Sequence, residues 1–236
     1  MRLNLFAVIL CLLSVNAIAQ TQSPLFQDRQ SIPGSKRQFY TNGGQVVSNS
    51  KYANLTSGTP YFRDTWMAGA IKTKDGTVYS GLRLKIDLIE NIVIYLDEEN
   101  REMQTAVPAV QASLKDTVNA NGETYVFTHS SAIGGGETMN KWFQVLASGN
   151  VSLYRLYQKD ILETKSYGST IPEQSVKTEE KYYVSFGGKL DRVKKIKDIA
   201  DAVGDSRIEP LLKANKFSDK KEADWVKAVE QINALP

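Results

Sequence analysis

Alternation between apolar and polar residues at positions 77–96 constrains the fold more than any other feature of this sequence. Within residues 77–88 every second side chain is apolar apart from one serine: Val78, Ser80, Leu82, Leu84, Ile86 and Leu88. The alternation resumes at residues 92–96. A side-chain period of two places one face of a strand on a core and the other face in water, which is typical of antiparallel sheets. We therefore expect two consecutive antiparallel strands here.

Turn residues flank these two strands. The Asp75-Gly76 step supplies the positive φ angle that a tight hairpin turn needs, and residues 97–101 form a second polar turn. Residues 67–73 read as an opening strand and residues 103–114 as a closing strand. Pro108 places the closing strand at an edge or a bulge, because proline cannot donate a ladder hydrogen bond. Residues 66–114 are thus predicted to form a meander of about four strands.

More strands are predicted after the meander. Residues 125–129 alternate, residues 142–146 and 151–157 form a hairpin around Gly149-Asn150, and residues 181–186 form one more strand. The polar stretch 159–180 is predicted to be a long hairpin loop. With about seven or eight strands, residues 61–186 are expected to form an antiparallel β domain, built as a curved sheet, a sandwich or a half-open barrel.

The hydrophobic period changes at Gly187-Gly188 from two residues to about 3.6. One stripe predicts a first helix ended by Gly204: Val193, Ile196, Ile199, Ala200 and Val203. A second short helix is expected near residues 208–212, and a third after Ser218. Residues 187–236 therefore form a C-terminal helical segment, which packs on the sheet or makes a small bundle. The predicted fold class is α+β, mainly antiparallel β.

The first residues indicate export. Arg2 precedes an apolar run at residues 5–15, and Ala17-Ile18-Ala19 matches the small-x-small pattern cleaved by signal peptidase. We predict a signal peptide at residues 1–19, cut between Ala19 and Gln20, and no transmembrane segment in the mature chain. The expected location is the periplasm, the outer membrane or the medium. Residues 20–60 are polar and predicted to be an extended or partly ordered arm.

Several kinds of site are missing from the sequence. His129 is the one histidine, and Cys11 is the one cysteine and lies in the signal peptide. Zinc sites need several such ligands, so no metal site is predicted. His129 is interpreted as a satisfied strand residue. The net charge of +3 is spread among mixed charges, which does not indicate a nucleic-acid partner. No catalytic residue, cofactor or metal ligand is proposed, although a distant pair of carboxylates stays open.

Aromatic residues gather in the second group of strands. The candidate ligand-contacting residues are Trp142, Tyr154, Tyr157 and Tyr182. They could form a platform that stacks on sugar rings or lines an apolar pocket. The favoured interpretation is that they are ordinary core and cross-strand residues, since strands favour aromatic side chains.

The order of these features resembles a broad set of uncharacterised secreted proteins of Bacteroidota. The resemblance covers residues 61–236 and rests on turn and strand motifs and the lysine-rich helical tail: Phe62-Arg63-Asp64-Thr65-Trp66, Gly69-Ala70-Ile71, Lys74-Asp75-Gly76 and Gly149-Asn150-Val151-Ser152-Leu153-Tyr154. It implies an architecture and a cell-envelope location, and it implies no activity.

Three functional hypotheses follow. The favoured one is a non-enzymatic envelope module that binds a protein or a polymer. The alternative is a periplasmic carrier of a lipid or another apolar ligand, held between sheet and helices. A carboxylate-based hydrolase is the least favoured, because the usual catalytic groups are absent.

Overall fold

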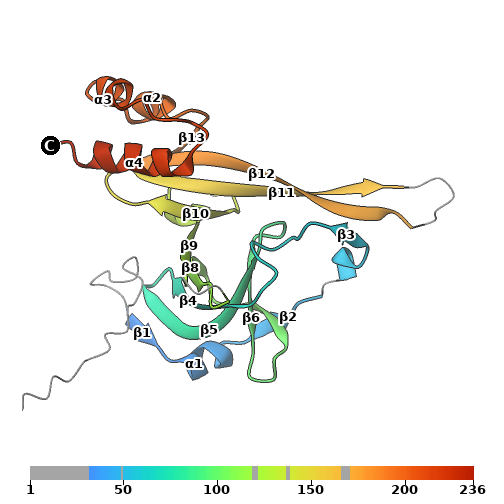
Figure 1. The fold of residues 1–236 in the computed structure, drawn as a ribbon. Helices are drawn as coiled ribbons and strands as arrows, with labels where there is room; N and C mark the ends of the chain where they lie inside the picture. Colours follow the sequence, from blue (N-terminus) through green and yellow to red (C-terminus); the bar gives the residue numbers. More distant parts are fainter. Residues whose placement is uncertain (1–31, 49, 119–121, 137–138, 166–170) are drawn as a thin grey trace, which may run out of the picture.

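The computed structural model describes residues 32–48, 50–118, 122–136, 139–165 and 171–236 (Figure 1). Mostly antiparallel strands form one large open sheet, and short helices lie near the C-terminus. The predicted α+β class is therefore confirmed. The predicted cleavage site at Ala19 and Gln20, and Cys11, lie outside the described residues.

Thirteen strands make up the sheet, in the order β13-β12-β11-β10-β9-β8-β4-β5-β6-β7-β2. These strands are β2 (Gly44–Val46), β4 (Met67–Thr73), β5 (Thr77–Asp87), β6 (Ile92–Leu96), β7 (Glu102–Thr105), β8 (Ala109–Lys115), β9 (Thr124–His129), β10 (Trp142–Ala147), β11 (Ser152–Thr164), β12 (Glu173–Phe186) and β13 (Lys189–Val193). Two short strands pair in parallel off this path: β1 (Ile32–Gly34) with β5, and β3 (Leu55–Ser57) with β12.

The expected meander is present, with one change in pairing. β4, β5, β6 and β7 pair in sequence order, and β8 then returns to pair with β4. The alternating apolar residues of β5 enter a first core, where Leu82, Leu84 and Ile86 are buried. Helix α1 (Lys36–Thr41) closes this core with Phe39, whose ring meets that of Tyr95 edge-on at 4.9 Å. The segment predicted as an arm thus contributes a helix and short strands between Ile32 and Ser57.

The predicted long loop at residues 159–180 is wrong. β11 and β12 pair without interruption from Ser152–Ser185 to Thr164–Glu173, which forms a two-stranded ribbon that extends beyond the rest of the sheet (Figure 1). No described residue of this ribbon between Gln158 and Lys181 is buried. Without a core beneath it, the ribbon leaves no apolar alternation in the sequence, and its polarity led to the prediction of a loop.

Three short helices cover one end of the sheet: α2 (Asp198–Val203), α3 (Ile208–Asn215) and α4 (Glu222–Asn233). They pack on β11, β12 and β13 around a second core, whose largest buried side chain is Trp225. The first helix is shorter than predicted, because Val193 belongs to β13 and reaches this core from the sheet. Within the described part of the chain no helix is long and apolar enough to cross a membrane.

Candidate interaction surface

The four candidate aromatic residues do not form one platform. Trp142 is 3% exposed, belongs to the first core, and donates its indole N–H to the carbonyl of Asn91 at 3.1 Å. Tyr154 is 7% exposed and packs in a separate small cluster with Phe143 and Leu156. Both side chains act as core residues, as strand aromatics commonly do.

Tyr157 and Tyr182 do come together, around the guanidinium of Arg155. Arg155 lies 4.8 Å above the ring of Tyr157. Tyr182 stacks on Trp225 of α4, with ring centroids 4.5 Å apart and planes within 10° of parallel. Burial raises the pKa of both tyrosines, so each hydroxyl stays protonated at neutral pH. These two side chains are partly buried and fix the base of the ribbon.

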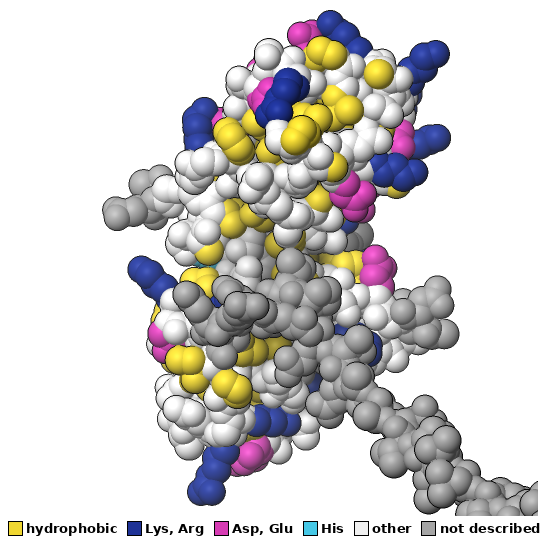
Figure 2. All heavy atoms as spheres, turned by 90° about the vertical axis from the view of Figure 1, so that its left-hand side faces the viewer, with side chains coloured by type: hydrophobic (Ala, Val, Ile, Leu, Met, Phe, Trp, Pro, Cys, Tyr) yellow, Lys and Arg dark blue, Asp and Glu magenta, His cyan; other side chains and the backbone are white. Residues whose placement is uncertain are grey.

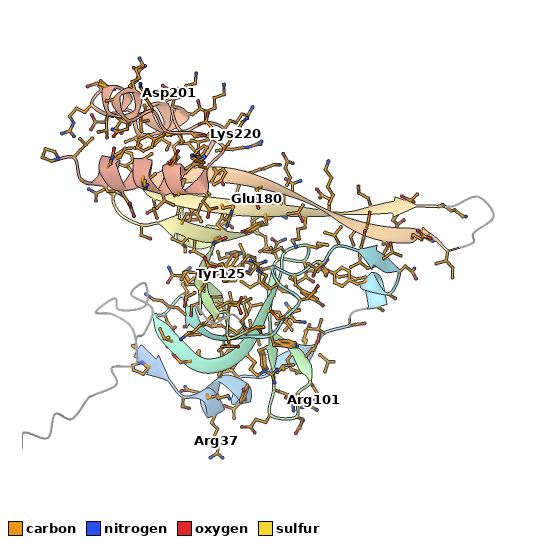
Figure 3. All side chains as sticks on the ribbon, viewed as in Figure 1. Arg37, Arg101, Tyr125, Glu180, Asp201 and Lys220 are labelled. Carbon is orange, nitrogen blue, oxygen red and sulfur yellow. The ribbon has the colours of Figure 1, made fainter. Side chains whose placement is uncertain are left out.

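Arg155 ties the ribbon to its surroundings. Its Nη2 donates to Oε1 of Gln144 on β10 at 2.9 Å, and its Nη1 pairs with Glu180 at 3.3 Å and with Glu222 of α4. Figure 3 shows Glu180 in the middle of the ribbon. Burial acts to lower the pKa of Arg155, but Tyr157 and the two glutamates outweigh it and raise that pKa. The guanidinium is therefore a permanent cation that holds three elements together.

Further out, the N-terminal half supports the ribbon through Lys159. Its ammonium donates to the carbonyls of Thr59 and Tyr61 at 2.8 and 2.6 Å. Burial lowers the pKa of Lys159, since these uncharged partners replace water. β3 also pairs with Gln174 and Ser175 of β12. A two-stranded ribbon is marginal alone, so these contacts stabilise its direction.

The outer edge of β11 is open beyond this point. β10 pairs with β11 only at Leu153, Tyr154 and Arg155, and no other described strand pairs with that edge. Every second residue at positions 158–164 therefore presents backbone N–H and C=O groups that no other described strand pairs, because the alternate residues bond β12. Leu162 is 48% exposed in the middle of this segment. An open edge with an exposed apolar side chain is a template for another strand.

Other free edges of the sheet are less suitable. β2 has three residues. β13 has five, of which Lys189, Asp191 and Arg192 are charged, and charges discourage pairing at an edge. The edge of β11 also carries charges, at Lys159, Asp160 and Glu163, but it is longer and has the adjacent apolar residues Ile161 and Leu162.

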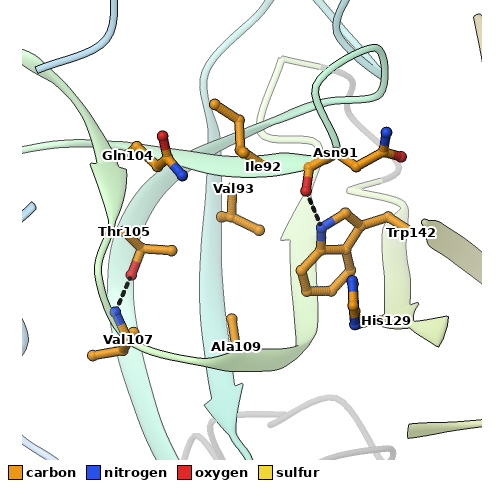
Figure 4. A pocket seen from close by; sticks show the side chains of 9 residues that line it. All are labelled: Asn91, Ile92, Val93, Gln104, Thr105, Val107, Ala109, His129 and Trp142. Carbon is orange, nitrogen blue, oxygen red and sulfur yellow. Dashed lines mark hydrogen bonds between the residues drawn. The ribbon is translucent and has the colours of Figure 1, made fainter. Parts of the chain in front are cut away.

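His129 and Trp142 line a small pocket beside the first core (Figure 4). Its volume of about 140 Å³ is below the range of about 300–1,000 Å³ that ligand pockets usually have. His129 is engaged at both ring nitrogens: Nδ1 lies 2.8 Å from Oγ of Ser131, and Nε2 lies 2.8 Å from Oδ1 of Asn140. The interpretation of His129 as a satisfied strand residue is confirmed.

Comparison with family models, curated proteins and solved structures finds no match. The function proposed below therefore rests on the geometry of the β11 edge. Among the residues that the structure describes, no group of three or more His, Cys, Asp or Glu side chains is placed to hold a metal ion.

Sequence reasoning missed the open edge of β11 and its support by Lys159. One signal was available, because one pair of oppositely charged residues faces across the ribbon. Asp160 lies opposite Lys177 in the register. Such cross-strand charge pairs favour a hairpin where apolar alternation is absent.

Proposed function

We propose that this protein is an exported, non-enzymatic module of the cell envelope, which binds an extended segment of a partner protein along the outer edge of β11. The unpaired edge at residues 158–164, projecting from the body of the sheet, is the observation that supports this function. The partner strand would gain main-chain hydrogen bonds from this edge, while alternate side chains select its sequence. Leu162 favours an apolar residue in the facing position.

The support around the ribbon fits this role. Arg155 and Lys159 hold the two strands to the body, so the edge is already extended before a partner arrives. A preorganised edge lowers the entropy cost of binding, because only the partner segment has to order.

Packing between helices and sheet argues against the carrier. Trp225, Ile199 and Val229 fill this interface and are at most 1% exposed. A lipid carrier needs space at that position, and interiors packed in this way hold no such ligand.

The hydrolase hypothesis gains no support from the carboxylates around the ribbon. Glu180 and Glu222 lie on either side of the Arg155 guanidinium, and each forms an ion pair with it. Both carboxylates are thus occupied by the same guanidinium, and neither faces an open cleft with the other as a catalytic pair would.

Site-specific photo-crosslinking in the native cells tests the proposal. A photoreactive residue at position 162 should give one discrete adduct, and the same residue at the exposed position 213 on α3 should not. The partner identified from that adduct, added to the purified protein, should slow hydrogen exchange at residues 158–164. Leu162→Lys should weaken this protection from exchange, since a lysine on an open edge opposes strand addition. Equal adducts at both positions, or unchanged exchange with the bound partner, would refute edge binding.

A further inference from the structure

Two loops rich in lysine meet at the end of the helical segment. One loop connects β13 to α2 and contains residues 194–197, and the other connects α3 to α4 and contains residues 216–221. The amide of Ile196 donates to Oδ1 of Asp219 at 2.7 Å, which joins the two loops directly. Lys220 marks this region in Figure 3.

Six exposed lysines lie on these joined loops, and we call them the lysine surface: Lys194, Lys195, Lys197, Lys216, Lys220 and Lys221. None of them forms an ion pair with another residue that the structure describes. Figure 2 shows Lys and Arg side chains projecting from the outline of the helical part of the molecule. These ammonium groups remain available to an external anion.

Aspartates in and beside the same loops are turned toward the backbone. Asp198 accepts from the amides of Lys194 and Lys195 at 3.0 and 2.9 Å. Asp224 accepts from the amide of Ser218 at 2.9 Å. Asp219 is held in the same way by Ile196. Because carboxylates are short and fixed here while lysine stems are long, the outermost charges of this surface are positive.

The hollow between α2 and α3 indicates what kind of anion can bind. Its volume is about 380 Å³, and four carboxylates line it together with two lysines: Asp198, Asp201, Glu209, Asp219, Lys197 and Lys213. A small anion inside this hollow would meet repulsion. The lysine surface also contains no arginine, whose planar fork usually recognises a single phosphate or carboxylate. The cations are therefore arranged for an extended anionic surface.

We propose that the lysine surface docks the protein on a bilayer rich in anionic lipid. In a cluster of four to eight lysines, each lysine near such a bilayer contributes about 1 kcal/mol to the free energy of binding. The attraction falls off within about one Debye length. This site is separate from the edge of β11, and either function can fail without the other. Docking through the helical end would leave the ribbon free to reach a partner.

Vesicle co-sedimentation of the purified protein tests this proposal. Vesicles of phosphatidylglycerol and phosphatidylcholine should bind the protein, and vesicles of phosphatidylcholine alone should not. The triple variant K194Q/K195Q/K220Q should reduce binding at least about tenfold, as loss of three cations near the surface implies. The matched variant K36Q/K74Q/K115Q removes the same charge from exposed positions elsewhere and should bind like the parent.

Three results would overturn the proposal. Equal losses in the two triple variants would mean that net charge alone drives binding. Binding that persists at high salt would exclude an electrostatic surface. Capture by immobilised heparin without any binding to anionic vesicles would assign the lysines to a soluble polyanion. Circular dichroism of both variants establishes that they are folded.

Discussion

Replacing Asn233 with alanine should cost about 2.5 kcal/mol of stability, although the side chain lies at the end of a helix. Asn233 Oδ1 accepts from the amide of Val151 at 2.8 Å, and its Nδ2 donates to the carbonyl of the same residue at 2.8 Å. The side-chain amide thus pairs with the backbone as a neighbouring strand would. This pairing fastens the C-terminal end of α4 to the turn between β10 and β11.

The magnitude follows from the burial of Val151, which is 2% exposed. Alanine leaves one buried N–H and one buried C=O without a partner, at about 1.5 kcal/mol each. The higher helix propensity of alanine returns about 0.5 kcal/mol. Urea unfolding followed by tryptophan fluorescence measures the difference by linear extrapolation.

Asn215→Ala is the matched control. Asn215 is exposed and donates only to the carbonyl of Leu211 within its own helix, at 2.9 Å. Its loss should change stability by at most about 0.5 kcal/mol. If both variants lose the same amount, or if Asn233→Ala loses less than about 1 kcal/mol, the side chain does not act as a strand surrogate and the reasoning fails.

Three more outcomes are expected. Trp225→Ala should destabilise the protein by about 3–5 kcal/mol in urea, because it empties the second core and removes the stack on Tyr182; a loss below about 1 kcal/mol would contradict the packing argument. The parent should gain stability as pH rises toward 10.5, because the lowered pKa of Lys159 lets the folded state release its proton before the unfolded state does. Lys159→Met should abolish this gain. Parallel pH profiles of stability for parent and variant would contradict the burial of Lys159. Burial, assisted by Glu102, raises the pKa of Tyr61 to about 12, so stability should fall as pH rises from 10 to about 12; Tyr61→Phe should reduce this fall, and an unchanged slope would contradict it.

Alternation predicted the meander because one face of its strands meets a core. Leu82, Leu84 and Ile86 show that face directly in the sequence. The turn at Asp75-Gly76 was equally readable, and Gly76 has the expected positive φ of 89°. Where burial and sequence period coincide, sequence reasoning located the strands.

Pairing partners and unburied strands could not be predicted in the same way. The return of β8 to β4 depends on which edge is free in space, and no local pattern records it. Ile161 and Leu162 are adjacent in the sequence and neither is buried. The outer ribbon therefore shows no alternation of apolar and polar residues from which a strand could be predicted. The candidate aromatics Trp142 and Tyr154 were visible by type, but their separation into different clusters follows from the pairing of distant strands.

Pairing of β3 with β12 has a consequence for the order in which the chain folds. Thr56 donates its hydroxyl to the carbonyl of Gln174 across 118 residues of sequence, at 3.0 Å. Contacts this distant form late, because a long loop must close before the contact contributes. β4–β7 and the hairpin of β11 and β12 pair strands that are neighbours in the sequence. The support of the ribbon by β3 is therefore among the last parts of the structure to form, and the first that local unfolding releases.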